Sequence, residues 1–97
     1  RSAATALYIL DEATVGLHRR DTRTLLSVLR ELTRRGATIV AVEHNLDFLS
    51  ACDFLVELGP DGGDRGGYLV ASGTPGEIAR DSESKTGSYL KKMAACA

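Results

Sequence analysis

Two short apolar runs on either side of an amphipathic segment constrain the fold of this chain more than any other feature. The first run, Leu7–Leu10, is continuously apolar, and the second, Thr38–Val42, is rich in β-branched residues. Each has the length of a strand, and an unbroken apolar run is typical of a strand that is buried on both faces. Strand, helix and strand at this spacing predict one βαβ unit, which is almost always right-handed and therefore has parallel strands.

The segment between the two runs has the pattern of a helix with one apolar face. We expect Asp21 to be its N-cap residue, and Gly36 to end it because glycine readily adopts the left-handed conformation. The apolar positions at helical spacing are Leu25, Leu26, Val28, Leu29 and Leu32, and the outward positions are Arg23, Arg30, Glu31 and Arg34.

The second half of the chain predicts a hairpin. A short helix is expected at Leu46–Leu49 and a third buried strand at Phe54–Leu58. The sequence GPDGGDRGG at Gly59–Gly67 predicts a flexible hairpin loop, since glycine allows positive φ. It is not a P-loop, because it lacks the Lys-Ser/Thr ending and the following helix. A fourth strand, Tyr68–Ala71, would then pair antiparallel with the third.

The last part of the chain predicts two helices. Thr74 and Glu77 have the spacing of a capping box, and Pro75 stands at the first helical position between them. A final helix follows a polar stretch, and the residues that we expect it to place against the core are Tyr89, Leu90 and Met93.

Length and composition limit the function. A chain of 97 residues predicts one compact unit, and no apolar run approaches the roughly 20 residues of a membrane-spanning helix. A net charge of -1, with arginines along one helix and scattered acids, gives no basic surface for a nucleic-acid backbone. Cys52 and Cys96 have no metal-binding spacing, so we expect reduced thiols in a cytoplasmic protein, with Cys52 in the core.

Both strand-like runs of the βαβ unit end in titratable residues. Asp11 and Glu12 follow the first run, and Glu43 and His44 follow the second. The carboxyl ends of parallel strands meet at one edge of a sheet, where ligands bind. After an aliphatic strand, an aspartate can hold Mg²⁺ and a glutamate can orient and deprotonate a water, while a histidine can hydrogen-bond a γ-phosphate. The alternatives are solvated strand ends and, for His44, a cap of the next helix.

The sequence LYILDEATVGLH followed by VEHNLD resembles the Walker B strand, D-loop and switch-histidine loop of ABC-type ATPases. The likeness is specifically to the UvrA family of the bacterial excision-repair nuclease. It continues through LVELGPDGGDRGG, VASGTPGEIA and SKTGSYL, and so covers Leu7–Lys92. It implies an α/β fold, namely a fragment of an ABC-type P-loop NTPase with a parallel sheet, flanking helices and a C-terminal β-hairpin.

The resemblance also implies a role for each site residue. Asp11 would contact Mg²⁺, usually through water, and Glu12 would polarise the water that attacks ATP. His44 would sense the γ-phosphate. The D-loop residues, which would cross to a partner ATPase half, are Gly16, Leu17 and His18, although a purely structural role for His18 stays open.

The chain departs from the family pattern at Ala13 and Val15, where a proline and a hydroxyl residue are more usual. It also contains no GxxxxGK[ST] and no LSGG-type signature. The resemblance implies that the remainder of a parent ATPase supplies these parts, including a Walker A strand between the second and third strands. We therefore interpret residues 1–97 as the C-terminal part of a nucleotide-binding domain. We expect this fragment by itself to be inactive and only marginally stable.

The resemblance predicts an ATPase that binds and hydrolyses ATP to drive DNA damage recognition in nucleotide excision repair. Its partners would be a second ATPase half and, through regions outside this chain, damaged DNA and a UvrB-like subunit, with no membrane. One alternative is a UvrA-like paralogue for resistance to DNA-binding antibiotics. Others are the nucleotide-binding domain of an ABC transporter, against which GPDGGDRGG argues, and a non-catalytic interaction module.

Overall fold

The computed structural model describes residues 6–59 and 67–96, and the chain divides into two compact units, 1–48 and 49–97. This differs from the single unit that the length predicts. The described strands form two separate two-stranded sheets, one in each unit. Most of the loop predicted at Gly59–Gly67 lies outside the described residues. Within the described ranges, no helix has the length and apolar character needed to cross a membrane.

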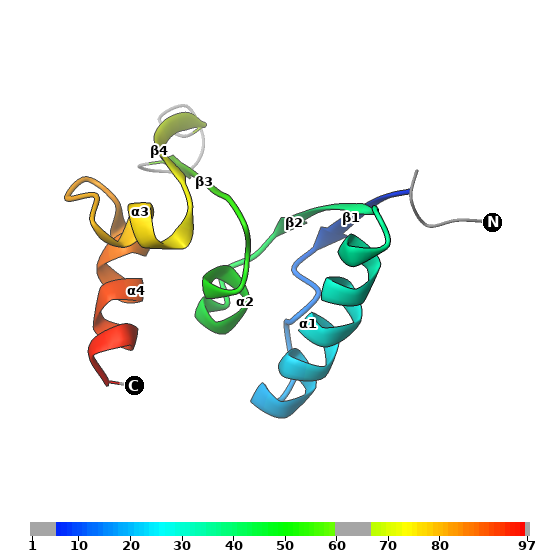
Figure 1. Ribbon diagram of the computed structural model, residues 1–97. Coiled ribbons are helices and arrows are strands. Elements are labelled where there is room, and N and C mark those ends of the chain that lie inside the picture. The colour runs from blue at the N-terminus through cyan, green and yellow to red at the C-terminus, as the bar shows by residue number, and fades with distance from the viewer. Residues whose placement is uncertain (1–5, 60–66, 97) are drawn as a thin grey trace. The chain divides into compact units, whose positions relative to one another are not determined.

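The first unit is the predicted βαβ unit. Strand β1 (Leu7–Asp11) pairs in parallel with β2 (Thr38–Val42), from Leu7 opposite Thr38 to Asp11 opposite Val42. Helix α1 (Arg19–Arg34) connects the two strands and runs alongside them (Figure 1). The prediction of two parallel strands joined by an amphipathic helix is confirmed.

Helix α1 begins earlier than its sequence predicts. Its N-cap is His18, whose backbone carbonyl accepts from the N–H of Thr22 at 3.0 Å and whose side chain makes no capping hydrogen bond. The prediction of Asp21 as N-cap is therefore wrong. Asp21 lies in the first turn instead, where a carboxylate interacts favourably with the helix dipole. The predicted end is confirmed, since Gly36 has a φ of 101° and its N–H donates to Thr33.

One face of the first sheet is covered and the other is open. Leu10, Ile39 and Ala41 alternate along the strands on one face and are half-buried, and Leu29 of α1 is buried. On the opposite face the exposed apolar residues include Leu7 at 60%, Ile9 at 71%, Val40 at 52% and Val42 at 53%. The expectation that the first strand is buried on both faces is therefore wrong for this chain. One helix covers only one side of a two-stranded sheet.

Helix α2 (Leu46–Ser50) follows β2 and confirms the predicted short helix. The side-chain oxygen of Asn45 accepts from the N–H of Phe48 at 2.9 Å, which is a helix-capping hydrogen bond. Cys52, expected in the core, is half-buried.

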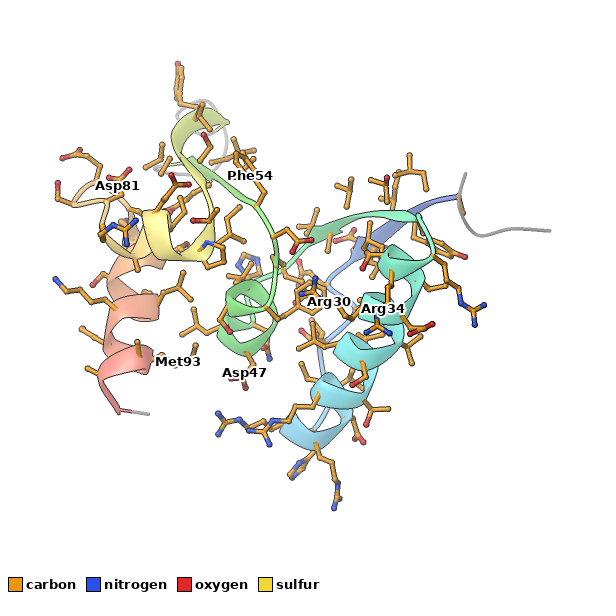
Figure 2. The ribbon with its side chains drawn as sticks, in the orientation of Figure 1. Arg30, Arg34, Asp47, Phe54, Asp81 and Met93 are labelled. Carbon is orange, nitrogen blue, oxygen red and sulfur yellow. The ribbon has the colours of Figure 1, made fainter. Side chains whose placement is uncertain are left out.

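The second unit contains the predicted hairpin, in which β3 (Leu55–Gly59) pairs antiparallel with β4 (Tyr68–Gly73). The register shifts by a bulge after Glu57. Only one face of β3 is buried: Leu55 is 7% exposed, whereas Val56 is 59% exposed and Phe54, just before the strand, is 61% exposed (Figure 2). The expectation of a fully buried third strand is wrong, because the described residues of this unit cover the hairpin on one side alone.

Two helices complete the second unit, α3 (Pro75–Ala79) and α4 (Lys85–Cys96). The capping box is confirmed: Thr74 Oγ1 accepts from the N–H of Glu77 at 3.2 Å, and Glu77 Oε1 accepts from the N–H of Thr74 at 2.8 Å. Ile78 and Leu90 are buried, and Met93 is half-buried (Figure 2).

Tyr89 does not pack into the core as its position predicts. Its side chain is 56% exposed, and the Lys92 ammonium lies 5.7 Å from the centre of its ring. A cation at this distance interacts favourably with the ring face. The apolar stripe of α4 is therefore narrower than its sequence suggests.

Candidate functional site

The candidate site is the edge of the first sheet where β1 and β2 both end. Asp11 is the last residue of β1 and lies opposite Val42, the last residue of β2. The pairing extends one step further, because the N–H of Glu12 donates to the carbonyl of Val42 at 2.8 Å. Neighbouring strands lie about 4.8 Å apart. The acid pair therefore begins beside the point where Glu43 and His44 leave β2.

Glu12 has an unusual backbone conformation. Its φ is 53°, and among the described residues it is the only one other than glycine with a positive φ. Its carbonyl accepts from the N–H of Val15 at 3.2 Å, which closes a tight turn directly after β1. Left-handed residues other than glycine are uncommon and cluster at active sites and ligand clamps. The conformation of Glu12 is therefore an independent indication of a functional turn.

The carboxylates of Asp11 and Glu12 are available to a ligand. Both residues are exposed, and neither side chain makes a hydrogen bond or ion pair within residues 6–59 and 67–96. Across those same residues, no group of three His, Cys, Asp or Glu side chains could hold a metal ion. A single accessible carboxylate does suit Mg²⁺, which keeps several waters and commonly shares one or two carboxylates with substrate phosphates. Asp11 fits that requirement.

The turn after the acid pair is tied to the end of β2 by two side-chain contacts. Thr14 donates its backbone N–H to Glu43 Oε2 at 3.1 Å and its hydroxyl to Glu43 Oε1 at 2.6 Å. Thr14 is 7% exposed and Glu43 is half-buried. Both oxygens of one carboxylate thus hold one residue of the neighbouring turn.

The predicted D-loop residues complete the connection to α1. Gly16 has a φ of 81°, with no atom within 4 Å of where a Cβ would stand. Leu17 is 41% exposed and donates its N–H to the carbonyl of Thr14 at 3.0 Å. His18 is exposed. An open hollow begins here and is lined by His18, Arg19, Arg20, Arg23, Thr24 and Ser27.

The start of α1 is also connected to the start of α2. Arg19 Nε lies 3.0 Å from Asp47 Oδ2, and the Arg19 side chain is 65% exposed while that of Asp47 is 28% exposed. An ion pair this accessible contributes little stability, because water screens it. It does keep one of the arginines beside the hollow directed towards the segment that follows His44.

His44 lies directly between Glu43 and the residue that caps α2. The cap is Asn45, so the alternative in which His44 caps the helix is wrong. His44 is exposed and follows the last residue of β2, Val42, by two positions. Its imidazole is therefore available to a ligand rather than committed to holding α2.

The sequence does not indicate the pairing of Thr14 with Glu43, although its motifs indicate Asp11, Glu12, Gly16, Leu17, His18 and His44. The only signals are a hydroxyl residue two positions after the acid pair and a glutamate before His44. Nothing in the spacing connects residues 29 positions apart. The contact becomes visible only when the parallel register places the two strand ends together.

Fold and site together define an α/β protein whose paired parallel strands carry two acids and an imidazole at one sheet edge. No protein-family model matches the chain. UvrABC system protein A of Clostridium acetobutylicum is 53% identical over 93 residues, covering 96% of this chain and 10% of that protein. The protein of the same name from Paracoccus denitrificans is 50% identical over 93 residues, covering 96% of this chain and 84% of that sequence.

A solved structure agrees with these relatives. The crystal structure of UvrA2 from Deinococcus radiodurans matches with a TM-score of 0.84 at 43% sequence identity, covering 89% of this chain and 11% of that chain. The chain belongs to the UvrABC system protein A family, as the sequence motifs predict. It spans about a tenth of the length of the Clostridium relative, at 10%.

Proposed function

We propose that this chain is the Walker B, D-loop and switch-histidine part of an ABC-type ATPase, within the C-terminal part of a nucleotide-binding domain. The observation that carries the proposal is the pairing of β1 with β2, because it brings the acid pair and the segment of His44 to one sheet edge. In open parallel sheets this edge is where ligands bind. The Walker A loop and the signature segment would come from other parts of the parent protein.

Each residue of the edge has a distinct part in the proposed hydrolysis of ATP. Glu12 accepts a proton from the attacking water and orients it. His44 donates a hydrogen bond to the γ-phosphate as negative charge develops there. Asp11 would hold Mg²⁺, usually through water, and the ion would neutralise charge on the phosphates.

The exposed turn of Gly16, Leu17 and His18 would contact a second ATPase half. Exposure of a large apolar residue such as Leu17 within a tight turn suits a surface that another part of the assembly covers. The nucleotide would then lie between two halves, with Asp11, Glu12 and His44 serving one site and the turn reaching towards the other.

The wider role proposed for the parent protein is ATP-dependent recognition of DNA damage in nucleotide excision repair. Support comes from relatives that carry the name UvrABC system protein A at 50% and 53% identity. DNA and a UvrB-like subunit would bind through regions outside this chain. A role in resistance to DNA-binding antibiotics is the alternative within the same family, and the test of that alternative is whether deletion of the gene sensitises cells to such antibiotics but not to ultraviolet light.

The catalytic proposal is tested by Glu12→Gln in the full-length protein. Loss of the general base should reduce ATP hydrolysis by at least about 100-fold. The affinity for ATP should stay within about twofold, because a neutral amide of the same shape leaves the phosphate contacts in place. Steady-state hydrolysis and equilibrium binding of a fluorescent ATP analogue measure the two effects.

Glu31→Gln is the matched control for that experiment. It makes the same change of carboxylate to amide on the exposed side of α1, where Glu31 pairs only with Arg34 and Arg35 in the described ranges. Hydrolysis should be unchanged. Undiminished turnover in Glu12→Gln would refute the assignment of Glu12 as the base.

A further inference from the structure

The turn that carries Glu12 is held from two directions by β2 and the residue after it. Before the turn, the N–H of Glu12 donates to the carbonyl of Val42 at 2.8 Å. Beyond it, Thr14 donates both its N–H and its hydroxyl to the Glu43 carboxylate. The residue whose backbone is left-handed therefore lies between two anchors on the neighbouring segment.

The anchor at Thr14 is specific in its chemistry. A carboxylate has two acceptor oxygens, and here each receives one of the two donors of a single threonine. Hydrogen bonds to an ionised acceptor are shorter and stronger than those between neutral groups. Thr14 is 7% exposed although Val15 next to it is 72% exposed, so the anchored residue is shielded from water within an otherwise exposed turn.

Glu43 also lies immediately before His44 in the chain. The anchor therefore connects the turn that presents Glu12 to the residue before the imidazole. In the described residues, the two hydrogen bonds of Thr14 to Glu43 are the only side-chain hydrogen bonds that join this turn to β2 or the residue after it. A shift of the segment after β2 would therefore move Thr14, and the turn with it.

We propose that Glu43 is a positioning residue, whose carboxylate holds Thr14 so that the left-handed turn presents Glu12 in its working orientation. This inference rests on the proposed function, because it concerns the orientation of the proposed base. Glu43 does not act on the nucleotide; it acts through Thr14 and the backbone of the turn.

The test uses two pairs of variants in the full-length protein. Glu43→Met keeps the length of the side chain and removes both acceptors, whereas Glu43→Gln can still accept from the N–H of Thr14 and donate to its hydroxyl. Thr14→Val keeps the shape and removes the hydroxyl, whereas Thr14→Ser keeps both donors. Glu31→Met makes the same change as Glu43→Met on the exposed side of α1 and serves as the control.

The expected result is a loss of kcat with an unchanged KM for ATP. Glu43→Met should lower kcat by about tenfold or more, towards the roughly 100-fold that misplacement of a catalytic group by an ångström costs. Thr14→Val should lose less, and Thr14→Ser and Glu43→Gln should recover most of the wild-type rate. Without nucleotide, amide hydrogen exchange of residues 12–18 should become about tenfold faster in Glu43→Met.

A double variant separates positioning from a merely structural role. If Glu43 acts through Glu12, then adding Glu43→Met to Glu12→Gln should leave the residual hydrolysis unchanged, since the base that it positions is gone. A further tenfold loss in that background would overturn the inference. So would a wild-type kcat in both Glu43→Met and Thr14→Val, and if Glu43→Met does not fold, Thr14→Val decides alone.

The outcomes distinguish this inference from the proposed function. If Glu12→Gln hydrolyses ATP normally, the assignment of the base fails first. If Glu12→Gln stops hydrolysis and the Glu43 and Thr14 variants do not change kcat, the base stands and the positioning role of Glu43 is wrong.

Discussion

The turn after β1 and the corner between α3 and α4 contain similar hydrogen-bonding groups. They differ in how much close packing contributes to their stability. Each contains a hydroxyl residue bonded to a glutamate: Thr14 with Glu43 in the turn, and Ser84 with Glu57 in the corner. The turn is exposed around Thr14, and Gly16 has open space beside it. In the corner, Ser84 is 4% exposed and Ile78 is 1% exposed.

Gly16 in the turn and Gly87 in the corner show how the structural requirements of the two regions differ. A Cβ on Gly16 would meet nothing within 4 Å, so the requirement there is the left-handed backbone alone. A Cβ on Gly87 would stand 2.0 Å from the carbonyl oxygen of Ile78, so the requirement there is space. The turn is therefore determined by backbone conformation and hydrogen bonds, and the corner by close packing of two helices.

The largest effect expected from this comparison is that of Gly87→Ala. The added methyl group must push α4 away from the backbone of α3, because a backbone carbonyl cannot rotate aside. Such overpacking should destabilise the corner by about 3 kcal/mol. Amide hydrogen exchange of residues 75–96 in the full-length protein measures this loss.

Gly76→Ala is the control for the corner, since the nearest side-chain atom to its Cβ position lies 3.8 Å away. Alanine is favoured over glycine in a helix, so this variant should be neutral or slightly stabilising. If both variants had the same stability, close packing would not be what holds α3 against α4.

A smaller effect is expected for Gly16→Ala. The methyl group has room, but a left-handed alanine costs about 1 kcal/mol. The turn should open more often without disturbing the corner, and hydrogen exchange should accelerate at residues 12–18 and not at residues 75–96. Gly16→Asn should lose less, because asparagine tolerates the left-handed region. Equal losses in the alanine and asparagine variants would mean that space, not backbone conformation, limits this position.

The smallest effect concerns the capping box of α3, an exposed polar contact at the edge of the corner. The backbone N–H of Thr74, and then its side chain, hold the pKa of the Glu77 carboxyl below its ordinary value, with a further contribution from Arg80. A carboxyl whose folded pKa is lowered stabilises the fold fully above its ordinary pKa, here 4.5, and this contribution is lost as the pH falls through the folded value.

Protection of α3 in the full-length protein should therefore weaken as the pH falls through the lowered pKa of Glu77, after correction for intrinsic exchange rates. Glu77→Gln should remove this pH dependence, because an amide does not titrate. A pH dependence that persists in Glu77→Gln would assign it to another group.

Local chemistry explains which parts of the fold were predictable from sequence. The strands at Leu7–Asp11 and Thr38–Val42, the left-handed Gly36 and the Thr74 capping box each depend on residues that are near neighbours. Burial was less predictable, because the exposure of Ile9 and Tyr89 depends on which element covers them. The start of α1 was misplaced, because His18 caps it through its backbone rather than through its side chain.

The candidate site also contains residues that are predictable from local sequence and a contact that is not. Titratable residues that follow strands are a recognisable pattern, and this pattern identifies Asp11, Glu12 and His44 as candidate site residues from the sequence. Their roles stay predictions. The bond between Thr14 and Glu43 could not be selected, since it arises from the register of two strands that are separated by a whole helix.

The left-handed backbone of Glu12 limits how this position can change during evolution. Glycine, asparagine and aspartate adopt that conformation most readily, whereas valine or isoleucine would distort the turn. If Glu12 is the base, as proposed, a descendant that gives up hydrolysis should replace it with one of the permissive residues and keep the turn intact. Under the proposed role of Glu12, such a protein would keep the turn and bind nucleotide without hydrolysing it.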